Sequence, residues 1–501
     1  MGPIKNSTAY LAIDLGAESG RAILGTVRGE QVRLDELHRF PNRPKRSHDG
    51  LHWDLSQLIK EVERSLLIAA ERTEGLLGGV AIDSWGVDYG LIDRKGRLLA
   101  DPVHYRDERT EGIMETVFES IPRSEIFEET GLQFLSLNTL YQLVAEKRDR
   151  PTLLAQAECL LFIADLVSHF LTGRAVAERT LASTSQLWNP RTSSWSPKVA
   201  KAAGIPTRIL PEVVEPGTLI APLRDQLSRR SGFRKPPPVI ACCAHDTASA
   251  IAAVPANEHE KWAYVSSGTW SMVGVELQAP KITPDVLREN FTNEGGLAGR
   301  VRFLRNVNGL WLIQECRREW AREDGRALSY DELTALALEH SNNKTFIDPE
   351  NAMFFAPKSM PNAIRSYCEQ TGQAVPSTRG AMLRCALESQ ALAYARVVRQ
   401  AVKLTGKNVQ RLHIVGGGSR NELLNQATAN AVELPTRAGP VEATALGNVL
   451  VQALATGAFQ DINELRSAVR SSFPAKEYQP QNLADWRCKR ETFGALRKKT
   501  P

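Results

Sequence analysis

The sequence has few of the features that mark disulfide-rich, metal-binding or membrane proteins. Its 501 residues include seven cysteines and no CxxC pair, which argues against a disulfide scaffold and against a thiolate metal site. Only Cys368 and Cys385 could meet, and whether they pair stays open. No apolar run approaches the length of a membrane span, and Met1 to Thr8 contains no apolar signal segment. We therefore predict a cytoplasmic protein with reduced thiols and no membrane partner.

The usual marks of nucleic-acid and nucleotide binding are missing as well. The formal net charge is only +5, and no dense run of Lys and Arg is interleaved with aromatic residues, which argues against a nucleic-acid partner. There is no GxxxxGK[ST] loop, no GxGxxG after the first strand and no HRD or DFG motif of a protein kinase. A site for ATP would have to be built in another way.

The sequence does contain enough apolar residues for two large α/β lobes. Apolar residues make up 42% and charged residues 24%, which is typical of a soluble globular protein too long for one core. We predict an N-terminal lobe over residues 1–254, a C-terminal lobe over 255–457 and a tail over 458–501 that packs back on the body. The first lobe is predicted to contain three strands, a helix capped by Asp54 and a fourth strand, over residues 10–15, 22–27, 31–40, 55–67 and 79–83. The apolar residues of this helix, Leu67 among them, are predicted to pack on the sheet.

An acid at the end of an apolar run is the first candidate for a catalytic group. Residues 239–244 are predicted to form a buried strand that carries His245 and Asp246 at its carboxyl end, where a helix opens. Asp246 could accept the proton of an attacking hydroxyl, because positioning matters more than base strength in a loose phosphoryl transfer. It could equally be a helix N-cap, where Asp is favoured. The two roles are compatible.

Two hairpin turns could contact phosphate. Asp14 stands at the mouth of the first hairpin, where it could hold Mg²⁺ through water while Arg21 and the turn amides contact phosphate. Residues 266–269 form a polar turn between two predicted strands and could do the same. Taken alone, each could also be an ordinary turn with a solvated side chain.

A triple glycine follows a predicted strand over residues 412–415. Gly416, Gly417 and Gly418 precede a helix for which Ser419 is the predicted cap, with Glu422 at the spacing of a capping box. Glycine would let an adenine or ribose approach the backbone closely, although a flexible turn is the plainer interpretation. A long helix is predicted just before this strand, over residues 379–404 and closed by Gly406.

Together these segments resemble the FGGY family of carbohydrate kinases. DLGAESGR and SSGTWS resemble its two phosphate motifs, IVGGGSRN resembles its adenosine motif, and IDSWGVD and VEATALGN resemble its connecting segments, at residues 14–21, 266–271, 414–421, 82–88 and 441–448. The resemblance spans nearly the whole chain. It implies an α/β fold of two actin/hexokinase-like, ribonuclease H-like lobes with a catalytic cleft between them.

The resemblance also implies a role for each residue of the site. Asp246 is expected to be the catalytic proton acceptor. The sugar is expected to contact Gly86, His245, Asp246, Thr247 and Asn306. ATP and its Mg²⁺ are expected to contact Asp14, which is the metal-binding residue, together with Gly16, Ala17, Glu18, Ser19, Arg21, Gly268, Thr269, Gln314, Gly416 and Gly417.

Further segments narrow the resemblance to a kinase of L-rhamnulose that phosphorylates the C1 hydroxyl and releases ADP. They are HYRDERT, FLSLNTLYQL, AHDTASAIAAVPA, NFTNEGG and GLWLIQE. Xylulose and glycerol kinases usually carry Gly-Asp-Gln where this chain has His245-Asp246-Thr247. The alternatives are L-fuculose or another ketose as substrate, or a non-catalytic sugar or nucleotide sensor on the same scaffold. The expected partners are a small-molecule ketose and ATP, bound by a monomer or a small homo-oligomer.

Overall fold

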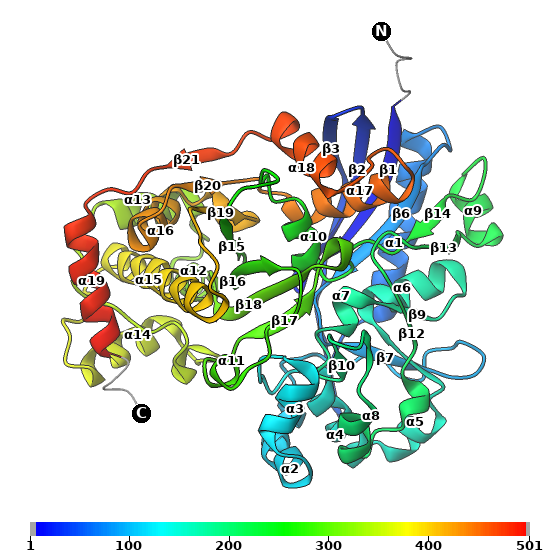
Figure 1. The fold of residues 1–501 in the computed structure, drawn as a ribbon, viewed down its shortest axis with the longest axis horizontal. Coiled ribbons are helices and arrows are strands. Elements are labelled where there is room, and N and C mark those ends of the chain that lie inside the picture. The colour runs from blue at the N-terminus through cyan, green and yellow to red at the C-terminus, as the bar shows by residue number, and fades with distance from the viewer. Residues whose placement is uncertain (1–6, 497–501) are drawn as a thin grey trace. The chain divides into compact units, whose positions relative to one another are not determined.

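The computed structural model describes residues 7–496, which form two compact units (Figure 1). Most of the N-terminal segment in which no signal sequence was found lies outside these residues. The first unit contains the described residues up to Ala253, together with Glu276–Phe303 and Ala443–Ser472. The second contains Val254–Val275, Leu304–Glu442 and the described residues from Phe473 onward. This grouping by spatial contact is a different partition from residues 1–254, 255–457 and 458–501, which stay a prediction.

A six-stranded sheet forms the centre of the first unit, in the order β13-β14-β6-β1-β2-β3. The strands β1, β2 and β3 are antiparallel neighbours, whereas β6 runs parallel to β1. All four strands predicted in this lobe are confirmed. The bounds are β1 (Thr8–Leu15), β2 (Ser19–Arg28), β3 (Gln31–Pro41), β6 (Gly79–Ser84), β13 (Leu219–Pro222) and β14 (Pro238–Ile240).

Helices cover this sheet. Because they bury β1, that strand consists of an almost unbroken run of apolar residues. The helix α17 (Ala443–Ala455) packs on β1 and β6, and α1 (Leu55–Arg72) packs on β2 and β3. Asp54 caps α1 as predicted, since its carboxylate accepts a 3.0 Å hydrogen bond from the Gln57 amide. Leu67 was predicted to face the core but is 48% exposed. The buried stripe of α1 passes through Leu66 and Ala69 instead, which leaves position 67 on the solvent side.

The segment before Asp246 is less regular than predicted. The strand β14 ends at Ile240, and residues 241–245 continue as extended chain that forms only an isolated bridge between His245 and Ser84. The helix α10 (Asp246–Ala252) then begins and packs against α17. The two helices approach closely because position 447 is glycine, since a Cβ there would strike the carbonyl oxygen of Ser249.

The remaining elements of the first unit surround this frame. Its shorter strands are β4 (Lys45–Ser47), β5 (Gly50–His52), β7 (Tyr89–Ile92), β8 (Cys159–Phe162), β9 (Val176–Glu178), β10 (Trp188–Asn189), β11 (Ser194–Trp195), β12 (Glu212–Val214) and β17 (Thr292–Gly295). Its further helices are α2 (Ile113–Ser120), α3 (Arg123–Thr130), α4 (Thr139–Asp149), α5 (Pro151–Gln156), α6 (Ile163–Thr172), α7 (Arg179–Ala182), α8 (Pro197–Ala202), α9 (Asp225–Ser231), α11 (Pro284–Arg288) and α18 (Ile462–Ser472).

In the second unit, strands follow the order β16-β15-β19-β20-β21. Their bounds are β15 (Trp262–Ser267), β16 (Trp270–Leu277), β19 (Arg411–Val415), β20 (Thr436–Ala438) and β21 (Lys476–Tyr478), and β18 (Val301–Asn308) carries Asn306. The strands β15 and β16 form the predicted hairpin, while β19 runs parallel to β15. The turn is shorter than predicted because β15 continues through Ser267, so only Gly268 and Thr269 connect the two strands.

The long predicted helix of the second unit is confirmed as α15 (Arg379–Thr405), and Gly406 ends it with a φ of 71°. It lies beside α16 (Glu422–Val432), both coloured yellow to orange in Figure 1. Ser419 was predicted to cap α16, and this was wrong. A 3₁₀ turn over Gly417–Arg420 intervenes, and Asn421 is the residue whose side chain accepts from the Leu424 amide. The other helices are α12 (Trp311–Asp324), α13 (Tyr330–Leu338), α14 (Met360–Gln370) and α19 (Leu483–Leu496).

Two expectations from composition can be compared with the structure. All seven cysteines are free thiols, including Cys368 and Cys385. Within residues 7–496, no helix combines the length and apolar character needed to cross a membrane.

Candidate active site

Three carboxylates gather at one edge of the sheet in the first unit. Asp14 is the penultimate residue of β1, and its register partner on the parallel strand β6 is Asp83. Asp246 begins α10, whose preceding residue forms the bridge to Ser84 at the end of β6. Parallel strands bring the residues at their carboxyl ends to the same edge, which is why these acids meet although they lie far apart in the sequence.

The three carboxylates differ in their surroundings. Asp83 is fully buried, and burial raises its pKa well above the ordinary value, with the charge of Asp14 adding to the effect. Asn448 of α17 donates a 2.6 Å hydrogen bond to Asp83 Oδ2. The Asp14 carboxylate forms an ion pair with Arg21, the residue opposite it in the hairpin. Burial therefore strongly disfavours the ionised form of Asp83, while Asp14 lies against the guanidinium group of Arg21.

The Asp246 side chain is the most open of the three, with 31% of its surface exposed. Burial raises the pKa of Asp246, His245 lowers it, and the nearby charge of Asp14 raises it again. Its Oδ1 atom accepts a 2.6 Å hydrogen bond from the Thr247 amide and lies 3.4 Å from His245 Nε2. The N-cap position belongs to His245, so the interpretation of Asp246 as the N-cap was wrong. Asp246 instead occupies the first turn of α10, next to this cap.

Gly86 lies in a sharply bent segment after β6. A Cβ at position 86 would stand 3.0 Å from the Thr184 side chain, and the next residue, Val87, has a φ of 68°. The Thr184 hydroxyl accepts a 3.1 Å hydrogen bond from the Val87 amide. Glycine is therefore required here for a close approach of two chain segments, which leaves the backbone at Gly86 without a side chain in the way.

Asp88 holds this bent segment together. Its carboxylate accepts hydrogen bonds from the indoles of Trp53 and Trp85 at 2.6 and 2.9 Å, and from Gln142 Nε2 at 2.8 Å. The backbone amide of Tyr105 adds a fourth at 3.2 Å. Burial raises the pKa of Asp88 to about 6 despite these donors. One buried acid thus orders the aromatic groups behind Gly86.

The first phosphate-like turn runs over residues 16–19 between β1 and β2. It is closed by a 3.0 Å hydrogen bond from the Gly16 amide to the Ser19 carbonyl oxygen. Asn42, just after β3, holds it from outside. Its side chain donates to the Gly16 carbonyl at 2.9 Å and its amide donates to the Glu18 carbonyl at 3.0 Å. The predicted residues Gly16, Ala17, Glu18, Ser19 and Arg21 are therefore brought together with Asp14.

The second phosphate-like turn lies in the second unit, beside the triple glycine. A Cβ on Gly416 would stand 3.0 Å from the Ser267 carbonyl oxygen, and one on Gly418 would strike the Ser267 hydroxyl. The amide of Leu310, which precedes α12, donates to the Gly268 carbonyl at 2.9 Å, and Gln314 lies one turn further along α12. The structure therefore brings together Gly268, Thr269, Gly416 and Gly417, with Gln314 on the neighbouring helix.

The predicted sugar residues fall on both sides of the division. Gly86, His245, Asp246 and Thr247 belong to the first unit, and Asn306 belongs to the second. Sequence reasoning missed several residues that support the site: Asn42, Glu178, Thr180, Glu294, Arg302 and Tyr394. Asp83 was not among the predicted site residues. It shows the same signal as Asp14, an acid at the carboxyl end of a buried strand, and that signal could have identified it.

Comparison with known proteins follows this geometry. Residues 9–253 match the N-terminal domain of the FGGY family of carbohydrate kinases, and residues 263–456 match its C-terminal domain. The chain belongs to the FGGY family of carbohydrate kinases. It is 42% identical to a rhamnulokinase of Bacteroides thetaiotaomicron, covering 95% of this chain and 97% of that one. It is 39% identical to a rhamnulokinase of Enterococcus faecalis, covering 94% of each.

Solved structures of FGGY kinases have the same fold. A gluconate kinase and a xylulose kinase from Lactobacillus acidophilus match with TM-scores of 0.80 and 0.79, each over 98% of both chains and at 15% identity. This confirms the predicted two-domain α/β fold. A carbohydrate kinase is a phosphotransferase, so the expected enzyme class is confirmed with it.

The FGGY site in the first unit offers oxygen donors that suit Mg²⁺. Among residues 7–496, no group of three or more His, Cys, Asp or Glu side chains is arranged to hold a metal ion directly. Mg²⁺ usually keeps several waters and binds one or two carboxylates plus substrate phosphates, so such a group is not required. Asp14 is a nearly buried carboxylate with the oxygen of Asp83 beside it. These donors fit the ion.

Proposed function

We propose that this chain transfers the γ-phosphoryl group of ATP to the C1 hydroxyl of L-rhamnulose, giving L-rhamnulose 1-phosphate and ADP. The observation that carries the proposal is the 42% identity to a rhamnulokinase over 95% of the chain. The partly exposed carboxylate of Asp246 beside His245 supports the proposal, because such a transfer needs a group that can accept the proton of the hydroxyl.

In the proposed reaction, Asp246 is the proton acceptor. The C1 oxygen forms a bond to the γ-phosphorus, the bond from that phosphorus to the bridging oxygen of ADP breaks, and the hydroxyl proton moves to the Asp246 carboxylate. In a loose transition state the base acts late, so its position matters more than its strength. The hydrogen bond from the Thr247 amide fixes Oδ1 and leaves Oδ2 to face the hydroxyl.

We propose that Asp14 holds Mg²⁺, which when bound to ATP neutralises charge on the phosphates. The amides of the turn over residues 16–19, with Arg21, would bind phosphate from the first unit. Gly268 and Thr269 would bind phosphate from the second, with Gln314, Gly416 and Gly417 around the nucleoside. Gly86, His245, Thr247 and Asn306 would position the sugar.

Several further expectations remain proposals of the same kind. They are a catalytic cleft between the two lobes, lobe boundaries at residues 254 and 457 with a tail over 458–501, a cytoplasmic location, and a monomeric or small homo-oligomeric state.

The role of Asp246 is tested by Asp246→Asn. We expect kcat to fall by about 10² to 10⁴, as for the loss of a general base, while ATP binding measured by calorimetry stays within about twofold. Asp225→Asn on α9, which removes an exposed acid of the first unit, is the matched control and should keep the wild-type kcat. Turnover of the Asp246→Asn enzyme near the wild-type rate would show that another group takes the proton.

The substrate is tested by ADP release with a panel of ketoses that includes L-rhamnulose and L-fuculose. We expect kcat/KM for L-rhamnulose to exceed that for every other ketose by at least about tenfold, because pocket contacts set these ratios. A preference for L-fuculose would move the proposal to that sugar. Binding of sugar and ATP without any turnover would instead favour the sensor.

A further inference from the structure

His245 stands between Asp246 and a buried ion pair in the first unit. Its Nε2 atom lies 3.4 Å from Asp246 Oδ1, and its Nδ1 atom lies on the other side of the ring, 3.4 Å from Glu294 Oε2. Arg302 Nη2 lies 3.0 Å from His245 Nδ1 and also 3.0 Å from Glu294 Oε2. The contact with Glu294 is an ion pair in which Oε2 accepts no hydrogen bond, so the hydrogen bond of Nη2 is the one to His245 Nδ1.

This contact favours one position for the proton of the ring. A guanidinium group only donates, so the Nδ1 atom that faces it must accept with its lone pair. In the neutral ring the proton then lies on Nε2, the atom that faces Asp246. The opposite tautomer would direct the Nε2 lone pair at an ionised carboxylate and leave the Arg302 hydrogen without its acceptor.

Arg302 is in turn held rigidly. Its side chain has no exposed surface, and its Nε atom donates a 2.7 Å hydrogen bond to the Gly295 carbonyl. Glu294 balances its charge, so that a buried guanidinium group beside a histidine is tolerated. Glu294 and Gly295 belong to β17, and Arg302 belongs to β18.

The backbone of His245 is fixed as well. Its amide donates a 3.0 Å hydrogen bond to the Thr180 hydroxyl, and the amide of Ala244 donates one of 3.0 Å to the buried carboxylate of Glu178. The Thr180 hydroxyl donates to the same carboxylate. Arg302 and Glu294 therefore position the ring of His245, whereas Thr180 and Glu178 position its backbone.

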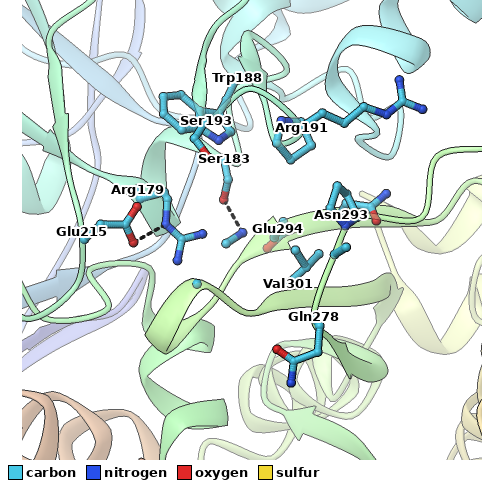
Figure 2. Close-up of a pocket in the computed structure, with 15 residues that line it drawn as sticks. Arg179, Ser183, Trp188, Arg191, Ser193, Glu215, Gln278, Asn293, Glu294 and Val301 are labelled. Atoms are coloured by element: carbon cyan, nitrogen blue, oxygen red, sulfur yellow. Dashed lines mark hydrogen bonds and ion pairs between the residues drawn. The ribbon is translucent and has the colours of Figure 1, made fainter.

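Glu294 also borders a cavity of about 400 Å³ in the first unit, shown in Figure 2. Arg179 lies in its wall, paired with Glu215 and donating to the Gly296 carbonyl. None of the predicted sugar residues lines this cavity.

We propose that Arg302, held by Glu294, is a positioning residue that fixes His245 as the tautomer with its proton on Nε2, so that the ring donates toward Asp246 and the substrate hydroxyl. The inference rests on the proposed function, in which Asp246 takes the hydroxyl proton. A donor on this side favours the ionised carboxylate and orients it, whereas a lone pair there would repel it.

The proposal is tested first by NMR of the wild-type enzyme labelled with ¹⁵N in its histidine rings. The resonance of His245, one of nine histidines, is assigned from its loss in His245→Asn. We expect a protonated Nε2 and an unprotonated Nδ1 in the enzyme without sugar or ATP. A proton on Nδ1, or a charged ring at the assay pH, overturns the proposal. Because no substrate is present, an incorrect choice of sugar does not affect this result.

Variants then link the tautomer to turnover. In Arg302→Met we expect a mixture of tautomers and a fall of kcat by at least about tenfold, with the KM for ATP within about twofold. Arg302→Lys should recover part of the loss, because an ammonium group can still donate to Nδ1. Arg300→Met is the control, since Arg300 is two residues away and pairs with Glu276 at 2.7 Å. Wild-type kcat and tautomer in Arg302→Met would refute the proposal, and if that variant does not fold, the wild-type spectrum decides.

Discussion

Asp88 is a buried carboxylate below the bend that carries Gly86, and its burial should make the stability of the protein depend measurably on pH. Burial raises its pKa from 3.8 to about 6. At about 1.4 kcal/mol per pKa unit, ionising Asp88 in the folded protein costs roughly 3 kcal/mol more than in the unfolded chain. The native state therefore binds this proton more tightly than the unfolded state does. The favourable contribution is fully present below about pH 4 and is lost as the pH rises through about 6.

Asp88→Asn isolates this contribution, because asparagine resembles the protonated acid in shape and charge. Its oxygen can still accept the three hydrogen bonds that Oδ2 receives from Trp53, Trp85 and Tyr105. Its amide replaces the oxygen that accepts from Gln142 Nε2, so this hydrogen bond is lost and we expect the variant to be less stable than wild type near pH 4. Between pH 4 and pH 8, the stability of the variant relative to wild type should rise by up to roughly 3 kcal/mol.

The assay is the melting temperature of both proteins from pH 4 to pH 8, compared as a difference at each pH. We expect the difference to change by a few degrees in favour of Asp88→Asn as the pH rises. Asp93→Asn is the control, since hydrogen bonds from Arg97 lower the pKa of Asp93, whose favourable contribution is lost only below about pH 4, so its difference from wild type should stay nearly constant over this range. Parallel pH profiles for wild type and Asp88→Asn would refute the assignment of a raised pKa to this acid.

Two further predictions concern the second unit. Tyr394→Phe removes the hydroxyl that lies 2.6 Å from Ser271 Oγ under the second phosphate-like turn. Losing about 1 kcal/mol of hydrogen bonding should raise the KM for ATP about fivefold. The control Tyr330→Phe, at an exposed tyrosine, should leave this KM unchanged. Gly418→Ala should lower the melting temperature by several degrees, because its Cβ would strike Ser267, while Gly417→Ala, with open space around its Cβ, should melt like wild type. Equal melting temperatures would contradict this reading of the glycines.

Local patterns predicted the parts of the fold that depend on neighbours in sequence. The apolar run before Asp14 predicted β1 correctly, and the helical period with a terminal Gly406 predicted α15 and its end. Errors arose where two local signals competed. Ser419 and Asn421 are both good helix caps. Because the 3₁₀ turn over Gly417–Arg420 includes Ser419, α16 begins later and Asn421 is its N-cap.

The supporting residues of the site could not be predicted in this way. The contact of Asn448 with Asp83 joins positions 365 residues apart, and that of Arg302 with His245 joins positions 57 apart. Neither has a periodicity or spacing that a single sequence reveals, because each depends on how the sheet and its covering helices pack. An arginine on a predicted strand is normally expected to lie at the protein surface. Only the complete burial of Arg302 in the structure shows that it must have a partner.

The carboxylates of the first unit show why such partners matter. Asp14, Asp83 and Asp246 lie close enough that the charge of Asp14 raises the pKa of both other acids. They cannot all be ionised at low cost in a buried place, so the surroundings must decide which is charged. Arg21 pairs with Asp14, complete burial raises the pKa of Asp83, and the Asp246 carboxylate lies beside His245. In the proposed site the neutral ring of His245 faces Asp246 with a donor, and the group that fixes this tautomer is Arg302, on a different strand.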